Sequence, residues 1–202
     1  ESHVHRLSLT PGADFEARAR AARYSAILPF VGPLDVVMTG HHQDDQVETL
    51  CLRLAQGTGL IGLTGIPVAR PFGLGHLVRP FLDLTRAQLR HECTLRNEAF
   101  VEDSSNLDIR YHRNLARLHL IPRLARIAPL ARSQLLALRR VAIADVERMR
   151  ARLAPCVPDR ETLIVPMADH AEGICWQIRF WCHAHGWYAP SSTMLDEFAR
   201  QC

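Results

Sequence analysis

The chain has 202 residues, of which 48% are hydrophobic, and a formal net charge of +3 at pH 7. This composition is typical of a globular protein, and no apolar run approaches the ~20 residues that a membrane span requires, so we expect no membrane partner. The first residues show no signal-peptide pattern, which predicts a cytoplasmic location. The sequence begins with Glu1 rather than Met, so we expect it to be part of a longer protein.

The first predicted elements are a helix, a strand and a second helix. The Ala- and Arg-rich segment 14–28 favours a helix, which Gly32-Pro33 terminates. The short apolar run 35–39 is typical of a buried parallel strand. In the helix that follows, apolar residues recur at helical spacing and define a buried face, formed by Val47, Leu50, Cys51 and Leu54. Gly57-Thr58-Gly59 ends this helix.

The next segments continue the alternation of strands and helices. Residues 78–81 are predicted to be extended, because Pro80 disfavours helix at the residue before it. Thr85 and Gln88 form a capping-box pattern that opens a helix ending near residue 96. Phe100-Val101 is predicted to be a short strand. This alternation predicts an α/β fold with a parallel sheet.

The C-terminal part is predicted to be mainly α-helical. Residues 129–153 favour a long helix, and the apolar stretch 163–165 follows a break that contains proline. A helix is expected over 170–184, and Ser191 or Ser192 caps a last one. The change in character near residue 125 predicts two domains, over 1–125 and 126–202.

Acidic residues gather where the predicted strand 35–39 gives way to a helix. Open α/β sheets bind ligands at the carboxyl ends of their strands, and this end carries His42, Asp44 and Asp45, with Glu48 and Thr49 one turn further on. Helix capping explains one of these acids, or two. The remainder indicate a site that holds Mg²⁺ with nucleotide phosphates, or one that binds a cationic substrate.

Basic residues dominate the segment from Ile109 to Ala144, which contains no Asp or Glu. All of its basic side chains that carry a full charge are arginines: Arg110, Arg113, Arg117, Arg123, Arg126, Arg132, Arg139 and Arg140. A solvated helical face is one interpretation of this pattern. The other is a nucleic-acid surface, because guanidinium groups bind phosphate and a surface of one sign attracts a polyanion. We favour the second interpretation.

The segment from His42 to Thr49, followed by Leu52-Arg53-Leu54 and Gly57-Thr58-Gly59, closely resembles the H-x-D-D-x-x-E-T and G-[ST]-G region of tRNA(Ile)-lysidine synthetases. Further segments resemble the same family in the same order and extend the likeness over nearly the whole chain: Glu16 to Arg20, Arg23-Tyr24, Arg79-Pro80, Val101 to Asn106, Asp108, Arg113-Asn114, Arg117, and Trp181 to Gln201.

This resemblance implies a partial Rossmann-like PP-loop domain, of the adenine nucleotide alpha hydrolase-like type, followed by a mainly α-helical tRNA-contacting domain. It also implies an ATP-dependent ligase. Members of the family adenylate the wobble cytidine of an isoleucine tRNA with a CAU anticodon and then join free L-lysine to it. ATP and Mg²⁺ are the implied cofactors, and a homodimer would be in keeping with the family.

The resemblance also assigns roles to individual residues of this chain. Asp45 and Glu48 would bind the amines of lysine, and a carboxylate there could accept the proton of the attacking amine. Arg20 and Arg23 would stabilise charge on the phosphate or the substrate carboxylate. Further contacts to lysine and tRNA fall to Arg53, Arg79, Arg113, Asn114 and Arg117. The nucleotide side falls to His42, Asp44, Thr49, Gly57 and Gly59, with Asp44 as the Mg²⁺ ligand.

The sequence departs from the family pattern in ways that bear on activity. The S-G-G-x-D-S loop that would hold the ATP phosphates does not occur in it, and Gln56 stands where the family usually has a basic residue. The chain also ends at Cys202, before a further domain that many members add. We therefore expect a fragment that is inactive alone. The alternatives are another PP-loop tRNA enzyme, such as a sulfur transferase, and an inactive tRNA-binding module.

Overall fold

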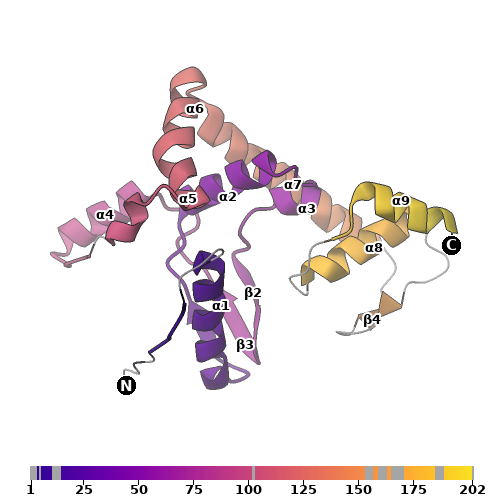
Figure 1. The fold of residues 1–202 in the computed structure, drawn as a ribbon, viewed down its shortest axis with the longest axis horizontal. Coiled ribbons are helices and arrows are strands. Elements are labelled where there is room, and N and C mark those ends of the chain that lie inside the picture. Colours follow the sequence, from indigo (N-terminus) through magenta and orange to yellow (C-terminus); the bar gives the residue numbers. More distant parts are fainter. Residues whose placement is uncertain are drawn as a thin grey trace. The chain divides into compact units, whose positions relative to one another are not determined.

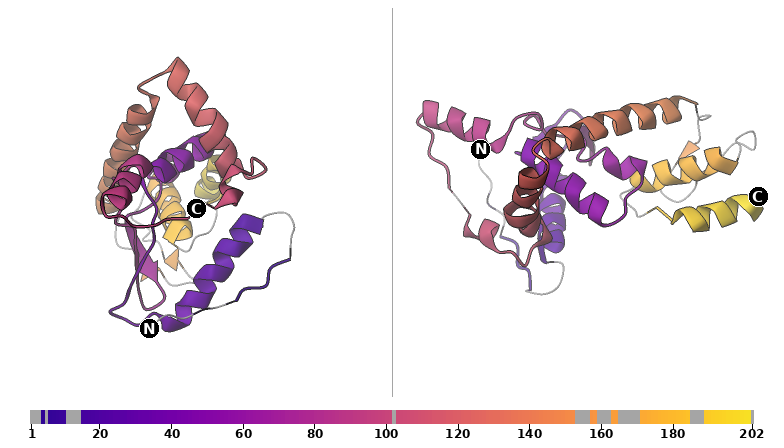
Figure 2. Two further views of the ribbon diagram at one scale, coloured as in Figure 1. Left: turned by 90° about the vertical axis from the view of Figure 1, so that its left-hand side faces the viewer. Right: turned by 90° about the horizontal axis from the view of Figure 1, so that it is seen from above.

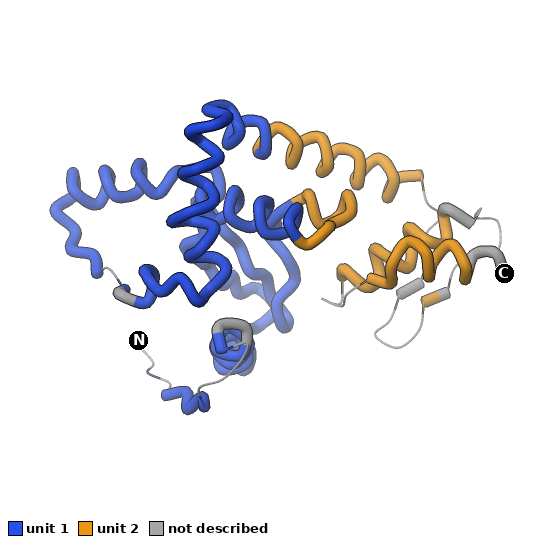
Figure 3. The backbone as a smooth tube through the Cα atoms, turned by 45° about the horizontal axis from the view of Figure 1, so that its top comes forward, with its two compact units in different colours: residues 1–55, 65–135 blue, residues 56–64, 136–202 orange. Residues whose placement is uncertain are grey.

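The structure, a computed structural model, describes residues 4, 6–10, 15–101, 103–152, 157–158, 163–164, 171–184 and 189–201. It divides into two compact units, and each is described by itself (Figure 3). The first unit comprises residues 1–55 and 65–135, and the second comprises residues 56–64 and 136–202. Among the described residues, no helix is both long and apolar enough to span a membrane.

The first unit contains a small mixed sheet. Its strands β1 (Val36–Met38), β2 (Ala69–Phe72) and β3 (Gly75–Val78) follow the order β1-β3-β2. The pairing of β1 with β3 is parallel and aligns Val37 with Leu77, which confirms the predicted strand and its parallel pairing. The antiparallel hairpin of β2 and β3 was not predicted.

Two glycines allow the β2–β3 hairpin to form beside β1. Gly73 occupies the turn with a φ of 60°, a conformation that side-chain-bearing residues rarely adopt. A Cβ atom on Gly75 would lie 2.3 Å from the Asp35 carbonyl oxygen, so only glycine fits at this close approach. A core of Val31, Phe72 and Leu77 covers one face of the sheet, and Tyr24 and Val37 pack against it.

Helix α1 (Phe15–Ile27) supplies part of this cover and confirms the predicted N-terminal helix. Its Tyr24 ring meets the Phe72 ring edge-on, with the ring centroids 5.4 Å apart. Figures 1 and 2 show α1 beside the hairpin. A short 3-10 turn, Leu28–Phe30, leads from α1 towards β1.

Helix α2 (Gln43–Ala55) carries the acidic motif, and its apolar face is largely as predicted. Val47, Leu50 and Cys51 are buried, whereas Leu54 is 44% exposed. The helix ends before Gly57, whose φ of 76° is typical of the glycine that terminates a helix.

The segments after the sheet contain one confirmed helix, one wrong strand and one helix that was missed. Helix α4 (Arg86–Leu95) begins with the predicted capping box, in which Thr85 and Gln88 bond reciprocally. The predicted strand at Phe100-Val101 is wrong: both residues are exposed coil, and no strand of the described chain pairs with them. A run of helix from His112 to Ile127 was not predicted. It consists of α5 (His112–Leu115), a π-helical turn (Ala116–Leu120) and α6 (Ile121–Ile127).

The second unit is mainly helical. It contains α3 (Leu60–Leu63) and most of α7 (Ala131–Arg152), whose first residues belong to the first unit. The short strands β4 (Val157–Pro158) and β5 (Leu163–Ile164) pair antiparallel. Helices α8 (Ala171–Ala184) and α9 (Ser192–Gln201) lie side by side (Figure 2). The predicted helices of this region are therefore confirmed, and the Ser191 hydroxyl caps the last one by accepting from the Met194 amide.

Candidate functional site

The acidic residues of α2 lie where the sequence predicted them, directly after the carboxyl end of a parallel strand. The Thr39 amide donates to the Val78 carbonyl and so continues the pairing of β1 with β3. Four residues later α2 begins, and the His42 amide donates to Asp45 Oδ2 at 2.9 Å. This bond is the half of a capping box in which an acid near the helix start accepts from the residue before the helix. It holds Asp45 in place at the start of α2.

Glu48 is buried and bound by two arginines. Its side chain is 1% exposed, and its Oε2 accepts from Arg113 Nε at 2.9 Å. Arg117 donates to both carboxylate oxygens of Glu48, from Nε to Oε1 at 2.6 Å and from Nη2 to Oε2 at 3.1 Å. This fork-shaped bonding is the strongest form of ion pair in proteins. Hydrogen bonding to Glu48 also raises the pKa of Arg117.

Asp45 lies on the other side of the same arginines. Its Oδ1 is 3.3 Å from Arg113 Nη2 and 3.7 Å from Arg117 Nη2. His42 approaches its other oxygen, with Nδ1 3.5 Å from Asp45 Oδ2. The structure thus joins Asp45, Glu48, Arg113 and Arg117 in one network, although α2 and the arginine-bearing helix lie far apart in the sequence.

A pocket of about 430 Å³ opens beside this network, and we call it the larger pocket. It is lined by Arg20, Arg23, Tyr24, Ile27, Thr39, Gly40, His41, Asp45, Asn106, Arg113, Asn114 and Arg117. Both arginines predicted on α1 reach it, and Arg20 Nη2 donates to the Tyr24 hydroxyl at 3.3 Å. Four guanidinium groups and one carboxylate in one cavity fit an anionic ligand.

His41 contributes a neutral imidazole to the larger pocket. Burial is the main cause that lowers the pKa of His41 from 6.5 to about 4, and the positive charges of Arg20, Arg79 and Arg113 contribute to this shift against an opposing effect of Asp45. The Thr39 hydroxyl and His41 Nδ1 are 2.9 Å apart and share a hydrogen bond. At neutral pH this side chain therefore acts as a hydrogen-bonding group without charge.

The pKa of His41 predicts a pH dependence of stability. Between pH 4 and 6.5 His41 is protonated in the unfolded chain and neutral in the folded chain. The free energy of unfolding should therefore rise with pH in this range. Urea unfolding at pH 4.5 and 6.5 measures the rise. The rise in the free energy of unfolding should be smaller in His41→Asn. It should be unchanged in His119→Asn, the control, because His119 is exposed. An unchanged rise in His41→Asn would assign the effect to other groups.

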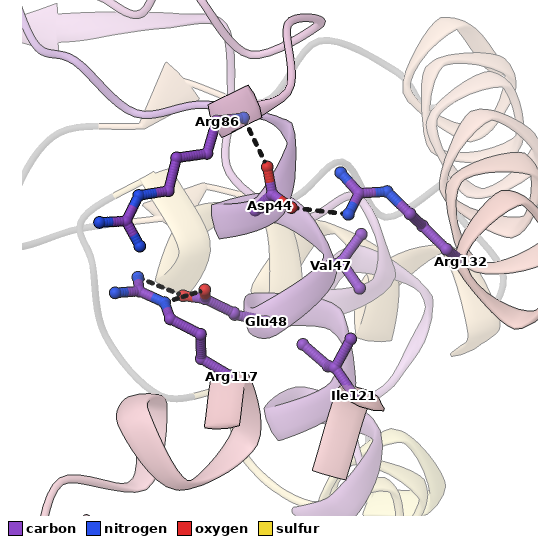
Figure 4. A pocket seen from close by; sticks show the side chains of 7 residues that line it. All are labelled: Asp44, Val47, Glu48, Arg86, Arg117, Ile121 and Arg132. Atoms are coloured by element: carbon purple, nitrogen blue, oxygen red, sulfur yellow. Dashed lines mark hydrogen bonds and ion pairs between the residues drawn. The ribbon is translucent and has the colours of Figure 1, made fainter. Parts of the chain in front are cut away.

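Asp44 points away from Asp45 and ties three helices together. Its Oδ1 accepts from Arg132 Nη1 at 2.6 Å, and its Oδ2 accepts from the Arg86 backbone amide at 2.8 Å. Figure 4 shows Asp44 between these two residues. Burial alone would raise the pKa of Asp44, but the bonds from Arg132 and Arg86 outweigh it and lower the pKa below 3.8.

The surroundings of Asp44 do not fit a bound Mg²⁺. Magnesium prefers several oxygen ligands, whereas both Asp44 oxygens here accept from nitrogen donors, one of them a cation. Within the described part of the chain, no group of three or more His, Cys, Asp and Glu side chains is placed to hold a metal ion.

Several residues predicted for the site lie elsewhere in the structure. Arg53 Nη1 donates to the Gly65 carbonyl at 3.0 Å. Arg79 is 2% exposed and donates to the Pro67 carbonyl at 2.7 Å, so it braces the chain before β2. Burial lowers the pKa of both arginines. Thr49 and His42 do not line the larger pocket, and Gly57 and Gly59 belong to the second unit.

Asn114 reaches the larger pocket but its amide is already engaged. The side-chain nitrogen donates to the carbonyls of Ser105 and Asp108, both at 2.9 Å. Asn114 therefore shapes the 3-10 turn Ser104–Leu107, from which Asn106 enters the pocket. The sequence prediction missed Arg86 and Arg132 as partners of Asp44. Only their positions in the sequence could have indicated this: Arg86 directly follows the helix cap Thr85, and Arg132 lies in the acid-free segment.

A helix start that follows a parallel strand and lines a polar pocket is the place where open α/β sheets bind ligands. Comparison with known families identifies the type of α/β domain. Residues 3–124 match the family model described as the PP-loop domain. The chain therefore belongs to the PP-loop family. Within it, the chain is similar to proteins named tRNA(Ile)-lysidine synthase, which confirms the resemblance and the fold class predicted from the sequence.

The similarity extends over nearly all of the chain. The lysidine synthase of Shewanella oneidensis is 35% identical over 96% of the chain and 46% of its own length. That of Coxiella burnetii is 33% identical over 95% of the chain and 44% of its own length. That of Pseudomonas fluorescens reaches 44% identity over 59% of the chain and 27% of its own length. The chain thus spans less than half the length of these relatives.

Proposed function

We propose that this chain is part of an ATP-dependent ligase that joins lysine to the wobble cytidine of an isoleucine tRNA with a CAU anticodon, releasing AMP and diphosphate. Two observations together support the proposal. The similarity to tRNA(Ile)-lysidine synthases covers nearly the whole chain, and one pocket is lined by Asp45, Arg20 and Arg113. The relatives' name identifies the product, and the pocket offers the charges that such a reaction requires.

The arginines of the larger pocket fit the anionic groups of the proposed reaction. Arg20 and Arg23 from α1 line the larger pocket together with Arg113 and Arg117. Its volume of about 430 Å³ lies within the roughly 300–1,000 Å³ of small-molecule sites. Bound ATP supplies the adenylyl group that activates the cytidine oxygen. The four guanidinium groups would stabilise the negative charge of the phosphates and of the activated nucleotide.

Asp45 is the residue we assign to proton transfer. The attacking amine of lysine must lose a proton, and a carboxylate within hydrogen-bond reach can accept it. Asp45 lines the larger pocket, and its position is fixed by the His42 amide. Glu48 is almost fully buried, so we assign it the positioning of Arg113 and Arg117 alongside the lysine contact predicted from the sequence.

The tRNA contacts are assigned to exposed arginines on α6. Arg123 and Arg126 are exposed, whereas Arg113 and Arg117 are held by Glu48. RNA phosphates therefore have freer access to the first pair. A cytoplasmic location and a homodimer remain part of the proposal. Mg²⁺ is proposed to accompany ATP, and Asp44 is not assigned to it, because both of its oxygens accept from nitrogen donors.

An ATP-consumption assay on the protein expressed from its whole reading frame tests this function. We expect release of AMP only when lysine and an isoleucine tRNA with a CAU anticodon are both present. A matched tRNA with another anticodon and a matched reaction with ornithine serve as controls. Equal turnover with either control would contradict the proposal, and turnover that needs tRNA but no amino acid would favour another PP-loop tRNA enzyme.

A further inference from the structure

Arg132 connects the first turn of α7 to the first turn of α2. Its Nη1 donates to Asp44 Oδ1 at 2.6 Å, and its Nη2 donates to the Gln43 side-chain oxygen at 3.0 Å. Figure 4 shows the Arg132 side chain directed at Asp44. One guanidinium group therefore holds two consecutive residues of α2, and we call Gln43, Asp44 and Arg132 the Arg132 clamp.

The segment that leads into α4 holds the same turn of α2. Asp44 Oδ2 accepts from the Arg86 amide at 2.8 Å, and the Gln43 amide donates to the Leu84 carbonyl at 2.8 Å. Side chains at a helix start often bond to the amides of their own helix, because these amides have no partner within it. Those of Gln43 and Asp44 bond to other elements instead, so the position of this turn depends on partners outside α2.

Asp45 is the next residue of α2 and lies on a different side of the helix. Consecutive side chains of an α-helix are about 100° apart, so Asp44 meets Arg132 while Asp45 lines the larger pocket. The two acids share a backbone, and a shift of the first turn moves both. A proton acceptor must lie about 2.6–3.2 Å from its donor, and a displacement of about 1 Å can lower a rate about 100-fold. The bonds that hold Asp44 therefore bear on the chemistry assigned to Asp45.

The Arg132–Asp44 ion pair is better suited to fixing a position than to stabilising the fold. Its side chains are 36% and 29% exposed, and ion pairs that are open to solvent add little to stability. The backbone that carries Arg132 is itself fixed, because the neighbouring Ala131 amide donates to the Ala128 carbonyl at 2.9 Å. An effect on the site should therefore be separable from an effect on folding.

The same bonds give Arg132 a role that differs from the one predicted from the sequence. The acid-free segment favoured a nucleic-acid surface for its arginines, Arg132 included. Both terminal nitrogens of Arg132 donate to side chains of α2, which leaves this residue less open to an RNA phosphate than the exposed Arg123 and Arg126.

We propose that Arg132 is a positioning residue of the ligase reaction: by holding Gln43 and Asp44 it fixes the start of α2, and so keeps Asp45 in place to accept the proton of the attacking amine. Arg132 contacts no substrate in this role. The inference rests on the proposed function, because it concerns the step assigned to Asp45. It adds a residue that lies 88 positions from Asp44 in the sequence.

Hydrogen exchange of the whole protein tests whether Arg132 holds α2. Arg132→Met removes the donors and keeps a long unbranched side chain, and amides at the start of the segment 43–55 should then exchange about tenfold faster. Arg148→Met is the matched control, because Arg148 also pairs with an aspartate, Asp145, but within α7 itself. It should leave exchange in α2 unchanged. Urea unfolding should give similar stabilities for both variants.

A double-mutant cycle tests whether the effect acts through Asp45. Arg132→Met should lower kcat for AMP release about tenfold, because a displaced acceptor still reaches the proton in part of the molecules. Added to Asp45→Asn, it should lower kcat no further, since the group that it positions has lost its function. Arg148→Met should leave kcat unchanged, and Arg132→Met should leave the affinity for the isoleucine tRNA unchanged.

Three results would overturn the proposal. One is unchanged exchange at the start of α2 in Arg132→Met, with or without weaker tRNA binding, which would place Arg132 on the nucleic-acid surface if tRNA binding is weaker. Another is an unchanged kcat. The third is an equal fall in kcat with and without the Asp45 carboxylate, which would show a general structural role. Failure of the ligase function would appear separately, as AMP release without a lysine requirement in the parent enzyme, and the exchange result does not depend on it.

Discussion

Replacing Glu48 with Gln should lower the free energy of unfolding by about 3–5 kcal/mol, the range for removal of one partner from a buried ion pair. The change preserves the shape of the side chain and removes its charge. Arg113 and Arg117, whose side chains are only 23% and 22% exposed, would then lose the negative charge of Glu48 that balances theirs. Urea unfolding of the variant beside the parent chain measures the loss.

Glu92→Gln is the matched control, because Glu92 also pairs with an arginine but at the surface. Its side chain is 57% exposed and lies 3.6 Å from Arg96 Nε. Such pairs contribute about 0–1 kcal/mol. If Glu48→Gln costs no more than Glu92→Gln, the network does not bear on stability.

Short sequence patterns correctly predicted the start of α4 and the buried face of α2. The capping box at Thr85 and Gln88 needs only four residues, and the buried face of α2 follows from spacing. The strand expected at Phe100-Val101 shows the limit of such signals. Its residues favour strands, but a strand requires a partner, and Val101 is 95% exposed with none beside it. The helix from His112 to Ile127 was missed because its π-helical turn shifts the apolar spacing away from the usual period.

The site was predictable in its residues but not in its pairings. Asp45 and Glu48 follow from their place after a strand, and Arg113 and Arg117 from the family resemblance. No local signal indicates that Arg117 bonds to Glu48 across 69 residues, or that Arg132 bonds to Asp44 across 88. The first pairing depends on how α2 packs against α5 and the following turn, and the second on where the first turn of α7 places Arg132. They decide which acids remain available to a ligand, which is why the predicted metal role of Asp44 found no support.

Replacing Asp45 with Asn in the whole protein should lower kcat by about 100- to 10,000-fold, the usual contribution of a general acid or base. Asn keeps the shape of the side chain and can still accept the bond from the His42 amide, so α2 should keep its start. The lost property is the ability to take a proton. KM for lysine should change less than kcat, because the lost carboxylate acts on the proton of the attacking amine.

The kinetic split distinguishes Asp45 from its neighbour. Asp44→Asn should lower kcat far less than Asp45→Asn does, because Asp44 bonds to Arg132 and the Arg86 amide and does not line the larger pocket. Asp83→Asn should change neither constant, since Asp83 is exposed and does not line the larger pocket. If Asp45→Asn raises KM for lysine without lowering kcat, Asp45 binds lysine, as the sequence first suggested, and does not act as the proton acceptor. The two adjacent acids of α2 thus have separable roles that steady-state kinetics can tell apart.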